Sequence, residues 1–455
     1  MSHLDQSYAF FYQRVLSPLH EGVLKRRKTL AYRTLLEASQ WWPPERLRAF
    51  QRDELRTLLA HAARSVPFWQ ARFKACGMTD RDIEQDESLW KLPVITKQEI
   101  RAHAEEMVST QFSGKTWSKA TGGSTGIPLQ FEYTPESYAW RMATTKRGYG
   151  WAGCDDGLKQ AYLWGGAVGR VPLWKRLKEQ LHHHLERKRY FNCFDFDEER
   201  MTQYLRMLNR YQPEVIVGYT NPLYHFAEFV SRVGGIHFSP KAVITGAEAL
   251  HAFQRDLMRR VFGCPVFNTY GSREFMLIAS ECEAHRGLHV SAENLLVEIL
   301  RDDGSPAKPG EMGRVVVTDL HNYGMPFIRY ELGDLGVVSD APCPCGRGLP
   351  LLAEVVGRSL DMIKAPDGRL VPGEFFPHLL KEFRGVRQFQ VVQDRVDRLT
   401  VRLVTDGSFE EGQLETIRRE VHKTVGGSLQ VEFAFVDQIP LTATGKFRVT
   451  VSELN

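Results

Sequence analysis

The segment that decides the fold contains EVIVGYT (214–220), KAVITGAEAL (241–250) and CPVFNTYGS (264–272). Each of these runs is apolar and ends in glycine and small polar residues, which is typical of buried strands that lead into tight loops. AYLWGG (161–166) shows the same pattern upstream, and helical sequence separates the runs. The alternation predicts an α/β fold whose ligands bind at the carboxyl ends of the strands.

The sequence on either side predicts a large first domain and a small second one. Residues 1–107 repeat apolar residues at three- and four-residue spacing, so they are expected to be mostly helical, with Thr96 as the N-cap of a helix in LPVITKQEI. Residues 286–340 alternate like antiparallel strands. The strand-like VRQFQVVQD, RLTVRLVTD and LQVEFAFVD, with the helix EEGQLETIRREVHKTV, then predict a compact α+β unit. We expect domains of residues 1–357 and 358–455.

The composition excludes several classes of protein. The net charge of +4 is too balanced to require a polyanionic partner, and the basic stretch 170–189, with its His182, His183 and His184, is expected to be a solvated helix face. It lacks the aromatic platform of a nucleic-acid site. Seven cysteines in 455 residues are too few for a disulfide scaffold, so a reducing, cytoplasmic location is expected. The opening residues have an early aspartate and no apolar signal-like run, and no apolar run reaches the length of a membrane span, so we expect a protein that is neither secreted by a standard signal nor membrane-spanning.

Five short motifs carry the chemistry. KATGGSTGIP (119–128) clusters three glycines, two threonines and a serine, whose backbone amides and hydroxyls can surround phosphate oxygens. NTYGSRE (268–274) follows a strand and combines an aromatic ring with a carboxylate that can hold Mg²⁺. RYELGD (329–334) ends in an aspartate that can accept hydrogen bonds from ribose hydroxyls. GRSLD (357–361) and TGK (444–446) complete the set.

In this order and at these separations, the five motifs resemble the adenylate-forming superfamily of acyl-CoA synthetases, over roughly residues 50–455. The resemblance is closest to the phenylacetate–CoA ligase branch, including its capsule-biosynthesis-type relatives. It implies a large adenylate-forming N-terminal domain, with helices on β-sheets and a β-barrel-like part, and a small mobile C-terminal domain. It also implies that a carboxylic acid reacts with Mg-ATP to give an acyl-adenylate, followed by transfer to a thiol. Coenzyme A is the expected acceptor, and an aryl or arylacetic acid is the default substrate.

The resemblance also assigns roles to matching positions. Those expected to bind the ATP phosphates are Thr121, Gly122, Gly123, Ser124, Thr125 and Gly126. Those expected around the nucleoside and α-phosphate are Gly246, Ala247, Glu248, Asn268, Tyr270 and Gly271, with Asp334 and Arg358 toward the ribose. The catalytic positions would be Lys446, Thr125 and the magnesium ligand Glu274, with Asp361 at the hinge. The chain departs from the family pattern at Ile127, where lysine is usual, and at Leu360, where an acidic residue is common.

Two aromatic segments fall where the family lines its acyl pocket. They are the residues 161–164, followed by Gly165 and Gly166, and the segment from Gly218 to Pro222. Aromatic walls would suit a flat or apolar acid. Ordinary core packing is the equal alternative.

The sequence also contains a candidate zinc site. Cys343 and Cys345 form a C-x-C turn, and Cys282, His285 and His289 lie upstream. Thiolates and an imidazole are good ligands for a closed structural zinc site, and buried free thiols are the alternative. Some members of the branch carry a Cys/His/Cys/Cys zinc site at matching places, which favours Cys282, His289, Cys343 and Cys345, with His285 as the alternative imidazole. Such a zinc ion would stabilise the β segment 282–345 and take no part in the reaction.

Two other functions stay open on the sequence alone. The enzyme could transfer the acyl group to a carrier protein or to an amine or hydroxyl, and the basic stretch 170–189 could dock an acidic carrier. Alternatively, the chain could be an inactive zinc-containing scaffold on a ligase fold. Retention of all five motifs argues against the scaffold. The sequence is also compatible with a homodimer.

Overall fold

The core of the protein is one mixed sheet. The computed structural model describes residues 3–84, 89–121, 129–165, 172–193, 197–356, 363–371, 373, 375–380, 382–439 and 449–454. Within these residues, the main sheet has eleven strands in the order β10-β11-β12-β13-β9-β8-β7-β6-β5-β3-β4. The strands from β4 to β7 are parallel, those from β7 to β10 are antiparallel, and β7 joins the two halves. The predicted α/β fold is confirmed.

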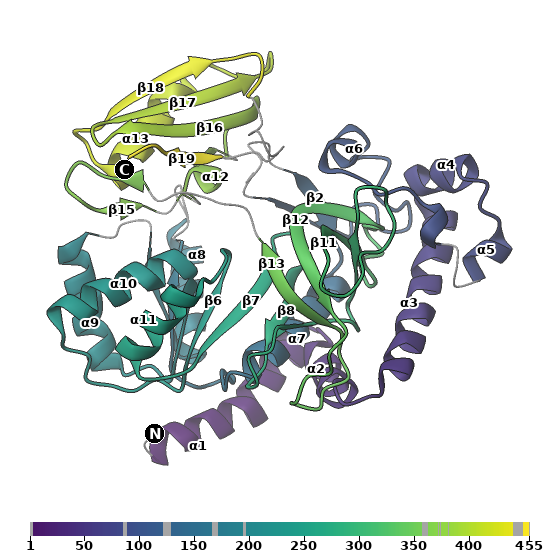
Figure 1. The fold of residues 1–455 in the computed structure, drawn as a ribbon, viewed down its shortest axis with the longest axis horizontal. Helices are drawn as coiled ribbons and strands as arrows, with labels where there is room; N and C mark the ends of the chain where they lie inside the picture. Colours follow the sequence, from purple (N-terminus) through teal and green to yellow (C-terminus); the bar gives the residue numbers. More distant parts are fainter. Residues whose placement is uncertain are drawn as a thin grey trace.

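The parallel half carries the strand runs that the sequence predicts. Its strands are β3 (Gln160–Trp164), β4 (Lys188–Asn192), β5 (Val215–Tyr219), β6 (Ala242–Gly246) and β7 (Val266–Ser272). All five residues of β5 and of β6 are buried, as expected for central parallel strands covered on both faces. The helices of this half are α7 (Pro135–Gly150), α8 (Leu173–Leu185), α9 (Glu198–Tyr211), α10 (Thr220–Val233) and α11 (Ala252–Phe262). Figure 1 shows α9, α10 and α11 gathered on the teal side of the molecule.

The antiparallel half continues the same sheet. Its strands are β8 (Met276–Glu281), β9 (Leu288–Val290), β10 (Leu295–Leu300), β11 (Met312–Asp319), β12 (Tyr330–Ser339) and β13 (Leu351–Val356). A separate antiparallel pair, β1 (Trp117–Ala120) and β2 (Gln130–Tyr133), flanks the glycine-rich motif. Ile95 forms an isolated parallel bridge with Tyr330, which fixes the chain before α6 against β12.

Helices dominate the N-terminal part of the chain. They are α1 (His3–Phe11), the π-helical η1 (Tyr12–Leu16) and η2 (Leu19–Leu24), α2 (Thr29–Ser39), α3 (Pro44–Ser65), α4 (Pro67–Ala75), α5 (Asp80–Glu84), the short η3 (Leu89–Lys91) and α6 (Lys97–Ala102). Pro44 and Pro67 occupy the first position of α3 and α4, where the missing N–H is not needed. The predicted N-cap is confirmed, because Thr96 and Glu99 form a reciprocal capping box at α6. Among the described helices, none is both long and apolar enough to cross a bilayer.

The C-terminal residues form a second, smaller sheet with its own apolar core. The elements are β14 (Ile363–Lys364), β15 (Leu370–Val371), α12 (Phe375–Leu380), β16 (Val386–Arg395), β17 (Arg398–Thr405), α13 (Gln413–Val425), β18 (Gln430–Phe435) and β19 (Thr450–Ser452). Its four main strands have the order β18-β17-β16-β19. The core also takes in Cys193 and Tyr219 of the parallel half. In Figure 1 this yellow-green sheet stands above the teal half.

Candidate active site

A cavity of about 470 Å³ opens at the carboxyl ends of the parallel strands. Such strand ends are where open α/β sheets bind their ligands. The lining residues that the sequence singles out are Thr121, Trp164, Tyr219, Gly246, Ala247, Glu248, Asn268, Tyr270, Gly271, Glu274 and Asp334. The fold thus brings together residues that span more than two hundred positions of sequence.

Close packing around the cavity requires two of the predicted glycines. A Cβ atom on Gly246 would lie 2.8 Å from the hydroxyl oxygen of Thr269, and a Cβ on Gly271 would lie 2.3 Å from the carbonyl oxygen of Met276. Ala247 follows β6 with a φ of +68°, a conformation that is uncommon outside glycine. The backbone therefore turns sharply where β6 reaches the cavity.

Glu248 anchors this turn to the start of α10. Its carboxylate accepts hydrogen bonds from the backbone N–H of Asn221 at 2.7 Å and from the side-chain amide of Asn221 at 2.8 Å. A carboxylate at a helix N-terminus is stabilised by the unpaired amides and the helix dipole. Glu248 therefore holds the cavity wall in place.

Tyr270 and Asp334 meet across the cavity wall. Tyr270 lies on β7 and donates a hydrogen bond from its hydroxyl to Oδ2 of Asp334, on β12, at 2.9 Å. Nearby, Oδ1 of Asn268 is buried and has no hydrogen-bond partner among the described residues. A buried acceptor without a donor is costly, so a ligand N–H at this point would be favourable.

Glu274 is the buried carboxylate of the site. It is 3% exposed and accepts a hydrogen bond from the Tyr330 hydroxyl at 3.0 Å. The ammonium group of Lys97 lies 3.6 Å from the same carboxylate oxygen. A buried charge needs such partners, and this arrangement places one anion and one cation together on the cavity wall.

Lys97 is a site residue that the sequence reasoning missed. It follows the Thr96 cap as the first residue of α6, a position that usually faces solvent. The bridge between Ile95 and Tyr330 turns this helix start toward Glu274. Because that bridge joins segments far apart in the chain, no local pattern marks Lys97 as a cavity residue.

Aromatic side chains line another part of the cavity. The rings of Trp164 and Tyr219 lie 4.4 Å apart, and Tyr149 and Leu277 contribute further apolar surface. Gly218 lets β5 and β3 approach closely, since a Cβ there would lie 2.8 Å from the carbonyl oxygen of Leu163. The cavity therefore combines a charged wall with an aromatic one.

Thr121 lies at the edge of the glycine-rich motif. Its backbone N–H donates to the carbonyl of Leu129 and its hydroxyl accepts from the Leu129 N–H, both at 2.9 Å. The remaining predicted site residues lie outside the described residues: Gly122, Gly123, Ser124, Thr125, Gly126, Arg358, Asp361 and Lys446. Their roles stay predictions.

A second group of side chains has the chemistry of a metal site. The donor atoms of Cys282, His289, Cys343 and Cys345 all lie within 4.8 Å of one another. The sulfur atoms of Cys282 and Cys343 are 3.6 Å apart, and the Cys345 sulfur is 3.3 Å from Nε2 of His289. Ligands around one tetrahedral zinc ion lie about 3.5–3.8 Å apart. The donor set and its spacing therefore fit zinc.

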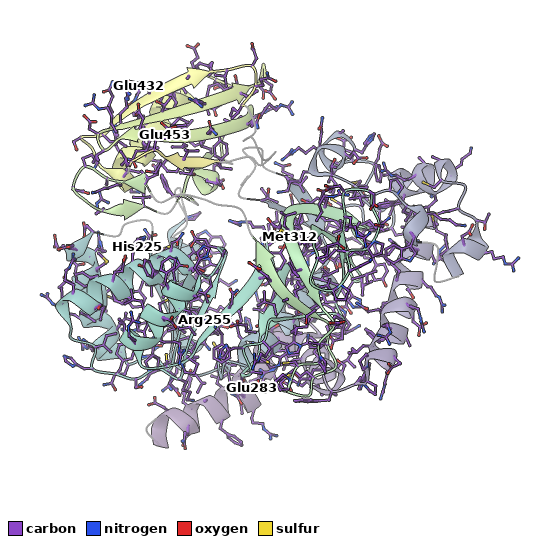
Figure 2. The ribbon with its side chains drawn as sticks, in the orientation of Figure 1. His225, Arg255, Glu283, Met312, Glu432 and Glu453 are labelled. Carbon is purple, nitrogen blue, oxygen red and sulfur yellow. The ribbon has the colours of Figure 1, made fainter. Side chains whose placement is uncertain are left out.

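The surroundings shift the pKa values of two of these groups toward the form that binds a metal. Burial lowers the pKa of His289 to about 4, so its imidazole is neutral at ordinary pH. Burial raises the pKa of the Cys345 thiol, but hydrogen bonds from the backbone and side chain of Arg347 and from the thiols of Cys343 and Cys282 together outweigh it, so the net shift is downward. Arg347 is itself paired with Glu283, which is labelled in Figure 2, at 3.0 Å.

His285 lies outside this cluster. Its Nδ1 is 3.2 Å from the carboxylate of Glu281 and 3.4 Å from the guanidinium of Arg255. Of the two histidines that the sequence left as alternatives, the fold places His289 with the cysteines.

Comparisons with known proteins identify relatives of this chain. A family model described as the CapK C-terminal domain matches residues 363–453. The chain is 24% identical over 368 residues to Protein CapK of Staphylococcus aureus, covering 80% of each chain. It is 26% identical over 439 residues to the phenylacetate-coenzyme A ligase of Thermus thermophilus, covering 89% of this chain and 96% of the relative.

The fold is also found among solved structures. A crystal structure of 2-hydroxyisobutyryl-CoA ligase in complex with R3-HIB-AMP matches with a TM-score of 0.57. The match covers 91% of each chain at 19% sequence identity, so it concerns the fold alone.

Proposed function

Because the chain belongs to the phenylacetate-CoA ligase branch of the adenylate-forming enzymes, we propose that it is an aryl acid–CoA ligase that releases AMP. The observation that carries the proposal is the single cavity in which the Glu274–Lys97 pair, the Tyr270–Asp334 pair and the aromatic wall meet. ATP and an aromatic carboxylic acid would bind there side by side.

The first half-reaction joins two anions, so positioning and charge neutralisation dominate catalysis. A carboxylate oxygen of the acid forms a bond to the α-phosphorus of ATP, and the bond to the bridging oxygen breaks, releasing pyrophosphate. Bound magnesium would neutralise phosphate charge, with Glu274 as its ligand. Lys446 would approach the α-phosphate, and residues Thr121 to Gly126, with Thr125 among them, would surround the β- and γ-phosphates.

The nucleoside would lie along the end of β6. Gly246, Ala247 and Glu248 would follow the adenine plane, Tyr270 would stack on it, and Asn268 would accept a hydrogen bond from the exocyclic amine. The unpaired Oδ1 of Asn268 supports this placement. Asp334, oriented by the Tyr270 hydroxyl, would accept hydrogen bonds from the ribose hydroxyls, with Arg358 beside it.

In the second half-reaction, the sulfur of coenzyme A forms a bond to the carbonyl carbon and loses its proton. The bond between that carbon and the phosphate oxygen breaks, and AMP leaves. We assign residues 1–357 to the domain that holds the adenylate and 358–455 to a domain that pivots at Asp361 and carries Lys446. Most of the apolar core of the C-terminal sheet comes from residues of that sheet and its helices, which supports this division.

The aromatic wall supports an aromatic acid as the proposed substrate. The rings of Trp164 and Tyr219, with Tyr149 beside them, offer flat apolar surface to a ring-bearing acid. The same wall leaves the carboxylate to face the charged side of the cavity, where Lys97 lies.

We also propose that Cys282, His289, Cys343 and Cys345 hold a structural zinc ion. The cluster closes with four protein donors and does not line the cavity. Closed four-ligand zinc sites stabilise folds and do not bind substrate. Bound zinc would tie β9 to the loop between β12 and β13.

The function is tested with a panel of aryl and aliphatic acids, measured by ATP–pyrophosphate exchange and then by AMP formation with and without coenzyme A. We expect exchange with aryl acids, AMP release that depends on coenzyme A, and a loss of exchange of at least about 100-fold in Glu274→Gln. An AMP release rate that is the same with and without coenzyme A would contradict coenzyme A as the acceptor. Exchange with aliphatic acids alone would contradict the proposed substrate.

A further inference from the structure

Helix α8 presents an apolar stripe to solvent. Trp174, Leu177, Leu181 and Leu185 follow one another at three- and four-residue spacing, so they share one face of the helix. They are 62%, 57%, 62% and 41% exposed. On the opposite face, His183 packs against Tyr190 of β4 with the ring centroids 4.5 Å apart. A surface helix normally buries its apolar face, whereas α8 exposes the face that carries these four apolar side chains.

The N-terminal helical segment adds a second exposed apolar row. Phe11, Val15, Leu19 and Val23 recur at four-residue spacing and are all exposed. This segment contacts the C-terminal end of α8, where Tyr8 donates a hydrogen bond to the Leu185 carbonyl at 2.8 Å. The two rows therefore lie on adjoining elements, and we call these eight residues with their flanking cations the α1–α8 surface.

Most of the exposed charges around this surface are positive, whereas most of its acidic side chains are paired or buried. Among the described side chains of residues 5–28 and 172–189, the exposed cations are Arg14, Lys25, Arg26, Lys28, Arg176, Lys178 and Arg189, of which Lys28 pairs with Glu136 at 3.2 Å. Three acidic side chains turn inward instead. Asp5 pairs with Arg187 at 3.0 Å, Glu186 pairs with Lys188 at 3.0 Å, and Glu21 is buried beside Thr29.

Among residues 5–28 and 172–189, this leaves Glu179 as the one exposed acidic side chain. Exposed cations on the same elements as exposed apolar rows are complementary to a surface that is both anionic and apolar. Positive charge alone, or apolar surface alone, would not select a partner that is both anionic and apolar.

We propose that the α1–α8 surface docks this protein on an anionic lipid bilayer. The apolar side chains would enter the boundary between headgroups and acyl chains, and the cations would meet the negative headgroups. Trp174 suits this depth, since tryptophan is enriched at membrane–water interfaces. A second copy of the chain would face the cations with the same cations, and an acidic protein would leave the apolar rows in water. The proposal does not depend on the proposed reaction.

The test uses the full chain and sedimentation with vesicles of phosphatidylcholine alone or mixed equally with phosphatidylglycerol. We expect binding to the anionic vesicles that weakens as salt is added, because ionic strength screens the cationic contribution. The variant Leu177→Glu with Leu181→Glu should bind about 100-fold more weakly, because two leucine side chains no longer enter the bilayer. Both leucines are exposed, so the fold should tolerate the changes.

A matched control replaces exposed apolar residues elsewhere. Val233→Glu with Met312→Glu changes two side chains that are 52% and 48% exposed, and Met312 is labelled in Figure 2 on the antiparallel half. This control should bind vesicles like the wild type. A second variant, Arg176→Glu with Lys178→Glu, keeps the apolar rows and should bind anionic vesicles about tenfold more weakly or worse.

Several results would overturn the proposal. They are a wild type that stays in solution with anionic vesicles, a leucine variant that still sediments with them, and a control that loses binding to the same degree. A wild-type dimer that the leucine variant dissociates, with no vesicle binding by either, would mean that the surface joins two copies of the chain.

Discussion

The hydrogen bond between Tyr270 and Asp334 gives the sharpest test of the proposed nucleotide site. The change Tyr270→Phe removes the hydroxyl that donates to Asp334 at 2.9 Å and keeps the ring that would stack on adenine. A hydrogen bond to a charged group contributes about 1.5–3 kcal/mol, and the lower value applies because Asp334 is only half-buried. Losing about 1.5 kcal/mol of orientation would raise the KM for ATP about tenfold.

The assay is ATP–pyrophosphate exchange at saturating acid, with ATP varied. We expect kcat to change by less than about twofold, because the contact orients the nucleotide and does not touch the reacting phosphorus. The matched control is Tyr162→Phe, which removes a similar hydrogen bond to Gln160 at 2.9 Å on β3. An unchanged KM for ATP in Tyr270→Phe, or an equal rise in Tyr162→Phe, would refute the role given to Asp334.

Three further predictions follow from other contacts. Cys343→Ser with Cys345→Ser should abolish zinc binding and lower the Tm by about 10 °C, measured by metal analysis and thermal unfolding; a variant that keeps one zinc per chain would contradict the cluster. Trp164→Ala should raise the KM for aryl acids at least about tenfold and change that for short aliphatic acids less, and equal effects would rule out an aromatic wall that selects the acid. Burial lowers the pKa of His321 from 6.5 to about 4, so the unfolded chain takes up the proton first. This group should therefore lower the free energy of unfolding by about 3 kcal/mol between pH 6.5 and 4. Denaturant titrations at several pH values should show that the free energy of unfolding of His321→Gln falls less steeply with decreasing pH than that of the wild type. An unchanged slope in that variant would contradict this assignment.

Much of the parallel half could be predicted because its strands are continuous in sequence. The apolar runs that end in Gly218, Gly246 and Gly271 are buried strands that lead to one cavity. The cysteine cluster was also visible, because two of its ligands lie in one C-x-C turn. The sequence favoured His289 over His285 only through the resemblance, because both histidines follow β8 closely and either spacing suits a metal site.

Other features depend on contacts between distant segments. The start of α6 reaches the cavity only because Ile95 bridges to Tyr330, so Lys97 could not be found locally. The basic stretch was expected to be a solvated helix face, and α8 does expose cations there. Its exposed leucines could not be foreseen, since the 3.6-residue pattern shows that a helix has an apolar face and not which way that face turns.

The central claim is that this cavity makes an acyl-adenylate. The most direct measurement is mass spectrometry of a single-turnover mixture of the protein, Mg-ATP and an aryl acid, with no thiol present. We predict a bound species with the mass of the acid joined to AMP, one equivalent of pyrophosphate, and neither product in Lys446→Ala. ADP and inorganic phosphate in place of the adenylate, or an adenylate that forms equally in Glu274→Gln, would contradict the account.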